Sequence, residues 1–206
     1  MTADSAKLRE DISHLAAVLV PTVPVDEVPS PEESLKIRAF IVLAHSAIEE
    51  AIEDRMHSAV KEALKCAGGT VPTIAVPLAV KYSPDLIGQN GGKVPDFDGC
   101  IAKLAPLYFT NVIKANNGIR RQNIDKMLKP LGYDSTALGE GVEDALSALD
   151  TLGAKRGASA HTLVVAAEEV IHPSQATEWV NQALDGADLV VDAILKKISE
   201  GVVDAA

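Results

Sequence analysis

An arginine and a histidine separated by four residues stand in the segment LGAKRGASAH, which ends at His161. The guanidinium of Arg156 offers a fixed fork of donors that suits phosphate oxygens. The imidazole of His161 exchanges protons near neutral pH. Metal-free RNA cleavage needs a base for the 2′-hydroxyl, an acid for the leaving 5′-oxygen and a cation beside the phosphoryl oxygens. The pair therefore has the residue types for this chemistry.

Two glycines affect how this pair would be held. On one continuous helix, Arg156 and His161 would lie about 140° apart around the axis. Gly153 and Gly157 predict a break instead, with Arg156 in the turn and His161 in the first turn of a new helix capped by Ser159. A helix N-terminus binds anions and lowers the pKa of a nearby histidine, which would keep His161 neutral as a base.

One histidine does not easily reach both sides of an in-line displacement. A two-fold dimer would bring two copies of the pair into one cleft and supply a base, an acid and two phosphate grips. If the pair is catalytic, the sequence therefore predicts a homodimer.

Positive charge concentrates at residues 114–129 in an otherwise acidic chain. We expect an RNA-backbone track that leads to Arg156 and contains Lys155, Lys114, Arg120, Arg121, Lys126 and Lys129. The alternative interpretation is a solvated helix face without a ligand.

The elements that must position these residues all have helical patterns. Pro31 and Glu33 after Ser30 form a strong helix start, and Pro106 predicts a kink or break. We predict an all-α bundle in one domain, residues 1–206, with one long irregular loop at 67–96. The predicted helices cover about 4–19, 31–66, 97–116, 119–128, 138–152, 159–171 and 174–200.

Composition limits the class of protein. The chain has 206 residues, 47% hydrophobic and 3% aromatic, with a net charge of -10, which disfavours broad electrostatic binding to nucleic acid but leaves room for a local basic groove. Its two cysteines form no CxxC pair, so we expect neither a disulfide framework nor a zinc site. With no segment typical of a signal peptide or membrane span, we expect a soluble, cytoplasmic protein.

Other motifs give weaker patterns. His45, Glu49, Glu53 and His57 follow i, i+4 steps on the long predicted helix, where a solvated charge ladder is the favoured interpretation. Together with Asp54-x-x-His57 and Glu169-x-x-His172 they leave a di-iron helical bundle as an alternative. The segment GGKV at 91–94 lacks the spacing of a phosphate loop. We predict no cofactor and no metal.

The motif and its context resemble a known superfamily. RGASAH at 156–161 has an arginine, four residues and a histidine, and similar context occurs at 123–133 (NIDKMLKPLGY), 144–152 (DALSALDTL) and 40–50 (FIVLAHSAIEE). These segments resemble the HEPN superfamily of all-α domains, many of which are RNases of defence, toxin–antitoxin and RNA-processing systems. The resemblance covers about residues 32–200, without 67–96. In active HEPN nucleases the residue after the arginine is usually polar, whereas this chain has Gly157.

The resemblance implies a metal-independent endoribonuclease with Arg156 and His161 as its catalytic residues. The implied partners are RNA, a second copy of the chain, and an antitoxin or regulatory protein, with no membrane. The alternative is a non-catalytic HEPN-like module that binds RNA or a protein.

Overall fold

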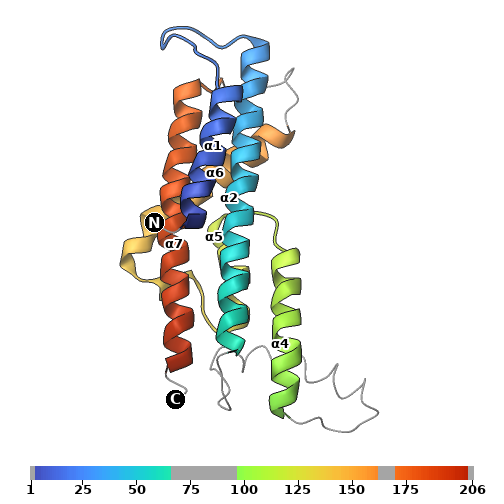
Figure 1. Cartoon of the computed structure of the whole chain (residues 1–206). Helices are drawn as coiled ribbons and strands as arrows, with labels where there is room; N and C mark the ends of the chain where they lie inside the picture. Colours follow the sequence, from blue (N-terminus) through green and yellow to red (C-terminus); the bar gives the residue numbers. More distant parts are fainter. Residues whose placement is uncertain (1–2, 66–96, 162–169, 204–206) are drawn as a thin grey trace. The chain divides into compact units, whose positions relative to one another are not determined.

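The computed structural model describes residues 3–65, 97–161 and 170–203 (Figure 1). Within these ranges every regular element is helical and no strand occurs, which confirms the all-α class. The predicted irregular loop at 67–96, and residues 162–169 of the predicted helix 159–171, lie outside the described residues.

The observed helices agree with most of the predicted ranges. Short 3-10 turns at Lys129–Leu131, Ser135–Leu138 and Glu140–Val142 connect α5 to α6. The α-helices are α1 (Ala3–Leu19), α2 (Pro31–Lys65), α4 (Phe97–Lys114), α5 (Arg121–Leu128), α6 (Glu143–His161) and α7 (Pro173–Val203).

Local chemistry explains where α2 begins and why α4 is continuous. Ser30 and Glu33 form the predicted capping box: the amide of Ser30 donates to Glu33 Oε2 at 2.8 Å, and the amide of Glu33 donates to Ser30 Oγ at 3.3 Å. The α4 helix passes through Pro106, so the chain does not break there. Thr110 Oγ1 donates to the carbonyl of Pro106 at 2.8 Å.

The predicted break at Gly153–Gly157 is wrong, because α6 is continuous from Glu143 to His161. Residues 159–161 are the end of α6 and not the start of a new helix. A glycine costs about 1 kcal/mol in a helix interior, which favours other residues there but does not forbid it. The reason for Gly153 lies in what packs against it, as described below.

The described helices form two compact units. The first contains residues 1–52, 118–121 and 141–190, and the second contains residues 53–117, 122–140 and 191–206, so that α2 and α7 contribute to both. In the first unit, Arg9 of α1 pairs with Asp185 and Asp188 of α7, each at 2.8 Å. Ile41 and Ile48 of α2 and Leu149 of α6 are fully buried there.

The second unit is joined by polar contacts around a core that includes Met56, Phe109 and Ile124. His57 of α2 shares a hydrogen bond of 2.9 Å with Thr110 of α4. Asn116 donates to Glu53 at 2.7 Å. No helix in the described ranges is both long and apolar enough to cross a membrane.

Within the first unit, α6 and α7 approach closely at Gly186. A β-carbon at this position would lie 2.8 Å from the carbonyl oxygen of Ala145. A backbone atom cannot move aside as a flexible side chain can, so glycine permits this helix contact.

We predict that Gly186→Ala lowers the free energy of unfolding by about 1–3 kcal/mol, because the added methyl group overpacks the contact between α6 and α7. Urea denaturation measures this change. Gly141→Ala is the matched control, because a β-carbon at Gly141 meets nothing within 4 Å. Equal stability of the two variants would contradict the close contact.

Candidate phosphate-binding site

Arg156 lies on the buried face of α6. With about 3.6 residues per turn, Ala145, Leu149, Leu152 and Arg156 fall on one stripe of a continuous helix. The first three are buried, at 5%, 0% and 0% exposure. Arg156 continues this stripe, and the residue is partly exposed, but its Nε atom is buried without a hydrogen-bond partner among the described residues.

A second arginine, Arg120, reaches α6 from the position just before α5, and its neighbour Arg121, the first residue of α5, anchors the backbone there. The amide of Arg121 donates to Asp150 Oδ1 of α6 at 2.8 Å. The guanidinium of Arg121 forms a bidentate ion pair with Glu143 of α6. These two contacts hold the backbone beside α6 and fix where the neighbouring Arg120 side chain begins.

The side chain of Arg120 lies over Gly153 and Gly157, which are one turn apart on α6, and Gly153 forms the notch for it. A β-carbon at Gly153 would lie 2.7 Å from Cγ and 3.2 Å from Nε of Arg120. A β-carbon at Gly157 would lie 3.9 Å from Nη2 of the same arginine. Gly153 thus makes room for the stem of Arg120, and the guanidinium extends toward Gly157.

His45 of α2 faces the same region of the first unit and is 1% exposed. Burial, together with the positive charges of Arg156 and Arg120, lowers the pKa of His45 from 6.5 to about 4. The ring is therefore neutral at pH 7. Its Nδ1 atom lies 3.6 Å from Glu49 Oε2, which is too far for a hydrogen bond, and a neutral ring forms no ion pair with that carboxylate.

Three buried polar atoms of the first unit have no hydrogen-bond partner among the described residues. Within the described residues, the buried side-chain nitrogen and oxygen atoms that have no hydrogen-bond partner are His45 Nδ1, Arg156 Nε and Ser159 Oγ. Each such atom costs stability. Arg156 Nε is a charged donor left unpaired on the same helix that Arg120 crosses, and two guanidiniums suit an anion with several oxygens, such as phosphate.

His161 is the last residue of α6, and its side chain lies outside the described residues. Its backbone lies about 140° from Arg156 around the helix axis and about 7.5 Å along it. The expected position of His161 at a helix N-terminus is therefore wrong, and so is the capping role of Ser159, which is buried within α6. The expected effect of an N-terminus on the pKa of His161 does not apply.

The other predicted RNA-binding residues are divided between the two units. Lys155 lies in the first unit, with its Nζ 4.5 Å from the centre of the Trp179 ring, a cation–π contact. The positive charge of Arg121 is paired with Glu143, as described above. Lys114, Lys126 and Lys129 are exposed and belong to the second unit.

The residues considered for a metal site have other environments. His45 is buried and so is not part of a solvated ladder, whereas Glu53 and His57 belong to the second unit and bond to α4 and the residues after it. His172 shares a 2.7 Å hydrogen bond with Ser174. Glu169 lies outside the described residues. In the described ranges, no group of three metal-ligating side chains occurs.

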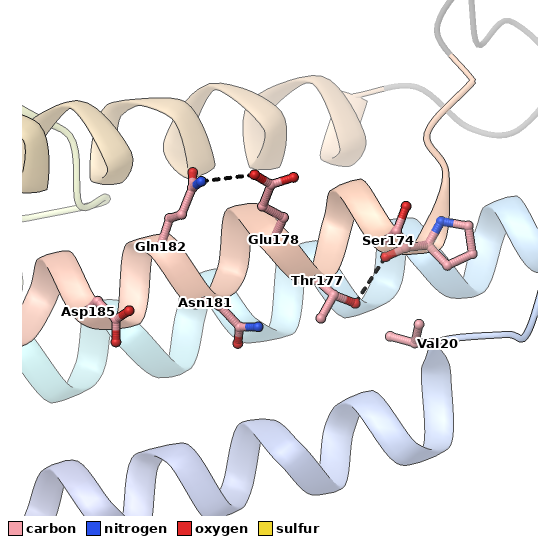
Figure 2. A pocket seen from close by; sticks show the side chains of 8 residues that line it. Val20, Ser174, Thr177, Glu178, Asn181, Gln182 and Asp185 are labelled. Atoms are coloured by element: carbon pink, nitrogen blue, oxygen red, sulfur yellow. Dashed lines mark hydrogen bonds between the residues drawn. The ribbon is translucent and has the colours of Figure 1, made fainter. Parts of the chain in front are cut away.

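A surface groove of about 570 Å³ lies between the end of α1 and the start of α7 (Figure 2). None of its lining side chains is basic, and two are carboxylates, so it does not suit an anionic ligand. The lining residues are Val20, Pro173, Ser174, Thr177, Glu178, Asn181, Gln182 and Asp185.

The spacing of His45 and of Arg156 along their helices places both residues on apolar stripes. His45 is four residues after Ile41 and three before Ile48, so it belongs to the apolar stripe of α2. Arg156 continues the stripe Ala145, Leu149 and Leu152 once α6 is continuous. No local signal predicts the contact of Arg120 with Gly153, because 33 positions of sequence separate them.

Comparison with known families agrees with this fold and motif. The family model RiboL-PSP-HEPN matches residues 3–196. The chain therefore belongs to the RiboL-PSP-HEPN family, within the HEPN superfamily. The match begins earlier than the resemblance at about residue 32. No curated protein and no solved structure matches the chain.

We predict that the stability of the protein falls as the pH drops from about 6.5 to about 4, in part because of His45. Between these pH values the unfolded state binds a proton at His45 and the folded state does not. Lowering the pH therefore stabilises the unfolded state relative to the folded state. Replacing His45 by Gln should remove up to about 3 kcal/mol of this loss, as seen by urea denaturation at pH 7 and pH 4.5. The exposed His14, replaced in the same way, is the control. An unchanged pH dependence in the His45→Gln variant would contradict the prediction.

Proposed function

We propose that the protein is a metal-independent endoribonuclease of HEPN type, with Arg156 as phosphate grip and His161 as proton-transfer residue. The observation that carries this proposal is the guanidinium of Arg156 on a core-facing stripe, with a buried unpartnered Nε and a second arginine beside it. Membership of the HEPN family supports it, because the motif RGASAH lies within the matched residues.

In the proposed reaction, the 2′-oxygen attacks the adjacent phosphorus and the bond from phosphorus to the 5′-oxygen breaks. A histidine takes the proton of the 2′-hydroxyl, and a protonated histidine gives one to the leaving 5′-oxygen. The products are a 2′,3′-cyclic phosphate and a 5′-hydroxyl. Arginine stabilises the charge that develops on the phosphoryl oxygens.

A homodimer would supply the two histidines on opposite sides of the phosphorus. Lys155 and the exposed lysines at 114, 126 and 129 would contact the RNA backbone further from the reacting bond. We propose a role in the cytoplasm, in a toxin or defence system, with an antitoxin or regulatory protein as partner.

We predict that the purified protein cleaves RNA in EDTA and leaves 2′,3′-cyclic phosphates. Loss of the proton-transfer group in His161→Ala should slow cleavage by about 10²–10⁴-fold. Loss of the phosphate grip in Arg156→Ala should slow it by about 10²-fold. Mapping the new ends in total RNA measures both effects, and a 2′-deoxy residue at the scissile position should prevent cleavage.

The control for these variants is His14→Ala, because His14 is an exposed histidine of α1. Cleavage that is equally fast in His161→Ala and His14→Ala would refute the assignment of His161. No cleavage of any RNA by the parent protein would favour the non-catalytic RNA-binding or protein-binding module.

We predict that Gly157→Asn raises the cleavage rate by about tenfold, the effect of one added hydrogen bond in the transition state. The resemblance to active HEPN nucleases implies a polar residue here, and a β-carbon at Gly157 meets Arg120 at 3.9 Å, an ordinary contact. Single-turnover rates of Gly157→Asn and the control Gly157→Ala test this. Equal rates would mean that a polar side chain at this position adds nothing.

A further inference from the structure

We propose that Arg120 is a second phosphate-binding residue of the site, held between Arg156 and His161 by the notch at Gly153. Its ligand is a phosphodiester of RNA. This inference rests on the proposed function, because it adds a substrate-binding residue to the same site.

The positions of the two glycines on α6 place Arg120 between the two motif residues. Around the axis of α6, and measured from Arg156, Gly153 lies at about 60°, Gly157 at about 100° and His161 at about 140°. The Arg120 side chain, which lies over the two glycines, therefore occupies the sector between the two motif residues. Its Nη2 lies close to Gly157, and Gly157 is one helical turn before His161.

The stem of Arg120 fits closely against Gly153. Because a β-carbon at Gly153 would approach Arg120 Cγ to 2.7 Å, any other residue at 153 must displace the stem of this arginine. Cγ is near the start of the side chain, so a rotation at the far end cannot relieve the contact. Together with the anchoring of Arg121 to Asp150 and Glu143, this fit gives Arg120 one defined direction.

The positive charges of Arg120 and Arg156 favour a shared anionic ligand. In the described part of the chain, neither Arg120 nor Arg156 has a hydrogen bond or an ion pair. Both positive charges lower the pKa of the buried His45, and Nη2 of Arg120 lies over Gly157, the residue that follows Arg156. Two neighbouring cations repel each other, and a phosphate with several oxygens can accept hydrogen bonds from both. A neutral His45 adds no further positive charge to this region.

The test measures binding without cleavage. A labelled 2′-O-methyl oligoribonucleotide of mixed sequence lacks the nucleophile, and its dissociation constant is measured over a range of salt concentrations. The variants are Arg120→Ala, Arg156→Ala and the double variant, with Lys7→Ala as control for loss of an exposed charge. Arg120→Ala should weaken binding by about tenfold and lower the salt slope by about one.

A glycine substitution tests the position of Arg120 while both arginines remain. Gly153→Ala should displace Arg120 and weaken binding about as much as Arg120→Ala, whereas Gly141→Ala should bind as the parent does. Arg120→Lys keeps the charge without the fork and should be intermediate. The loss in the double variant should differ from the sum of the single losses, since both arginines bind one phosphate.

Two results would overturn the inference. The inference requires Arg120→Ala and Gly153→Ala to bind RNA more weakly than their controls. Dissociation constants equal to those of Lys7→Ala and Gly141→Ala would therefore refute it. Absence of any binding by the parent protein also refutes it. Arginine-dependent binding without His161-dependent cleavage would support the phosphate site and reject the nuclease, so the two proposals fail separately.

Discussion

The charged side chain of Arg156, on the buried stripe of a continuous helix, is the constraint on which the rest of the site depends. A guanidinium in this position cannot contribute apolar packing, and its Nε is left without a partner among the described residues. A second arginine and a neutral histidine lie in the same region of the first unit. This arrangement is unfavourable for stability alone and favourable for holding an oxyanion.

The glycines of α6 follow from the same constraint. A second arginine can pack across the helix only where no side chain projects from it, and Gly153 leaves this space for the stem of Arg120. The cost in helix propensity is about 1 kcal/mol per glycine, which the buried residues of α6 can offset. The anchoring of Arg121 to Asp150 and Glu143 places the neighbouring residue at the notch. The site is thus built from three segments of the first unit.

Much of the fold was predictable because its signals are local. The capping box at Ser30 and Glu33, and the apolar stripes of α2 and α7, gave helices at nearly their observed bounds. The predicted break in α6 is wrong because it rests on the low helix propensity of glycine, whereas Gly153 is explained by its contact with Arg120. The burial of His45 was missed because its neighbours at i, i+4 are charged, although its own spacing fits the apolar stripe. Contacts between distant segments, such as Arg120 with α6, leave no periodic pattern in a single sequence.

The most direct test of this account is to observe the Nε–H groups of the arginines by NMR while a 2′-O-methyl oligoribonucleotide is added. Arg120→Lys and Arg156→Lys would assign the two signals. The account predicts that the signals of Arg120 and Arg156 shift together, at the same ligand concentration, while that of Arg9 in its ion pair with α7 does not. Shifts confined to other arginines, with Arg120 and Arg156 unchanged at saturation, would contradict it.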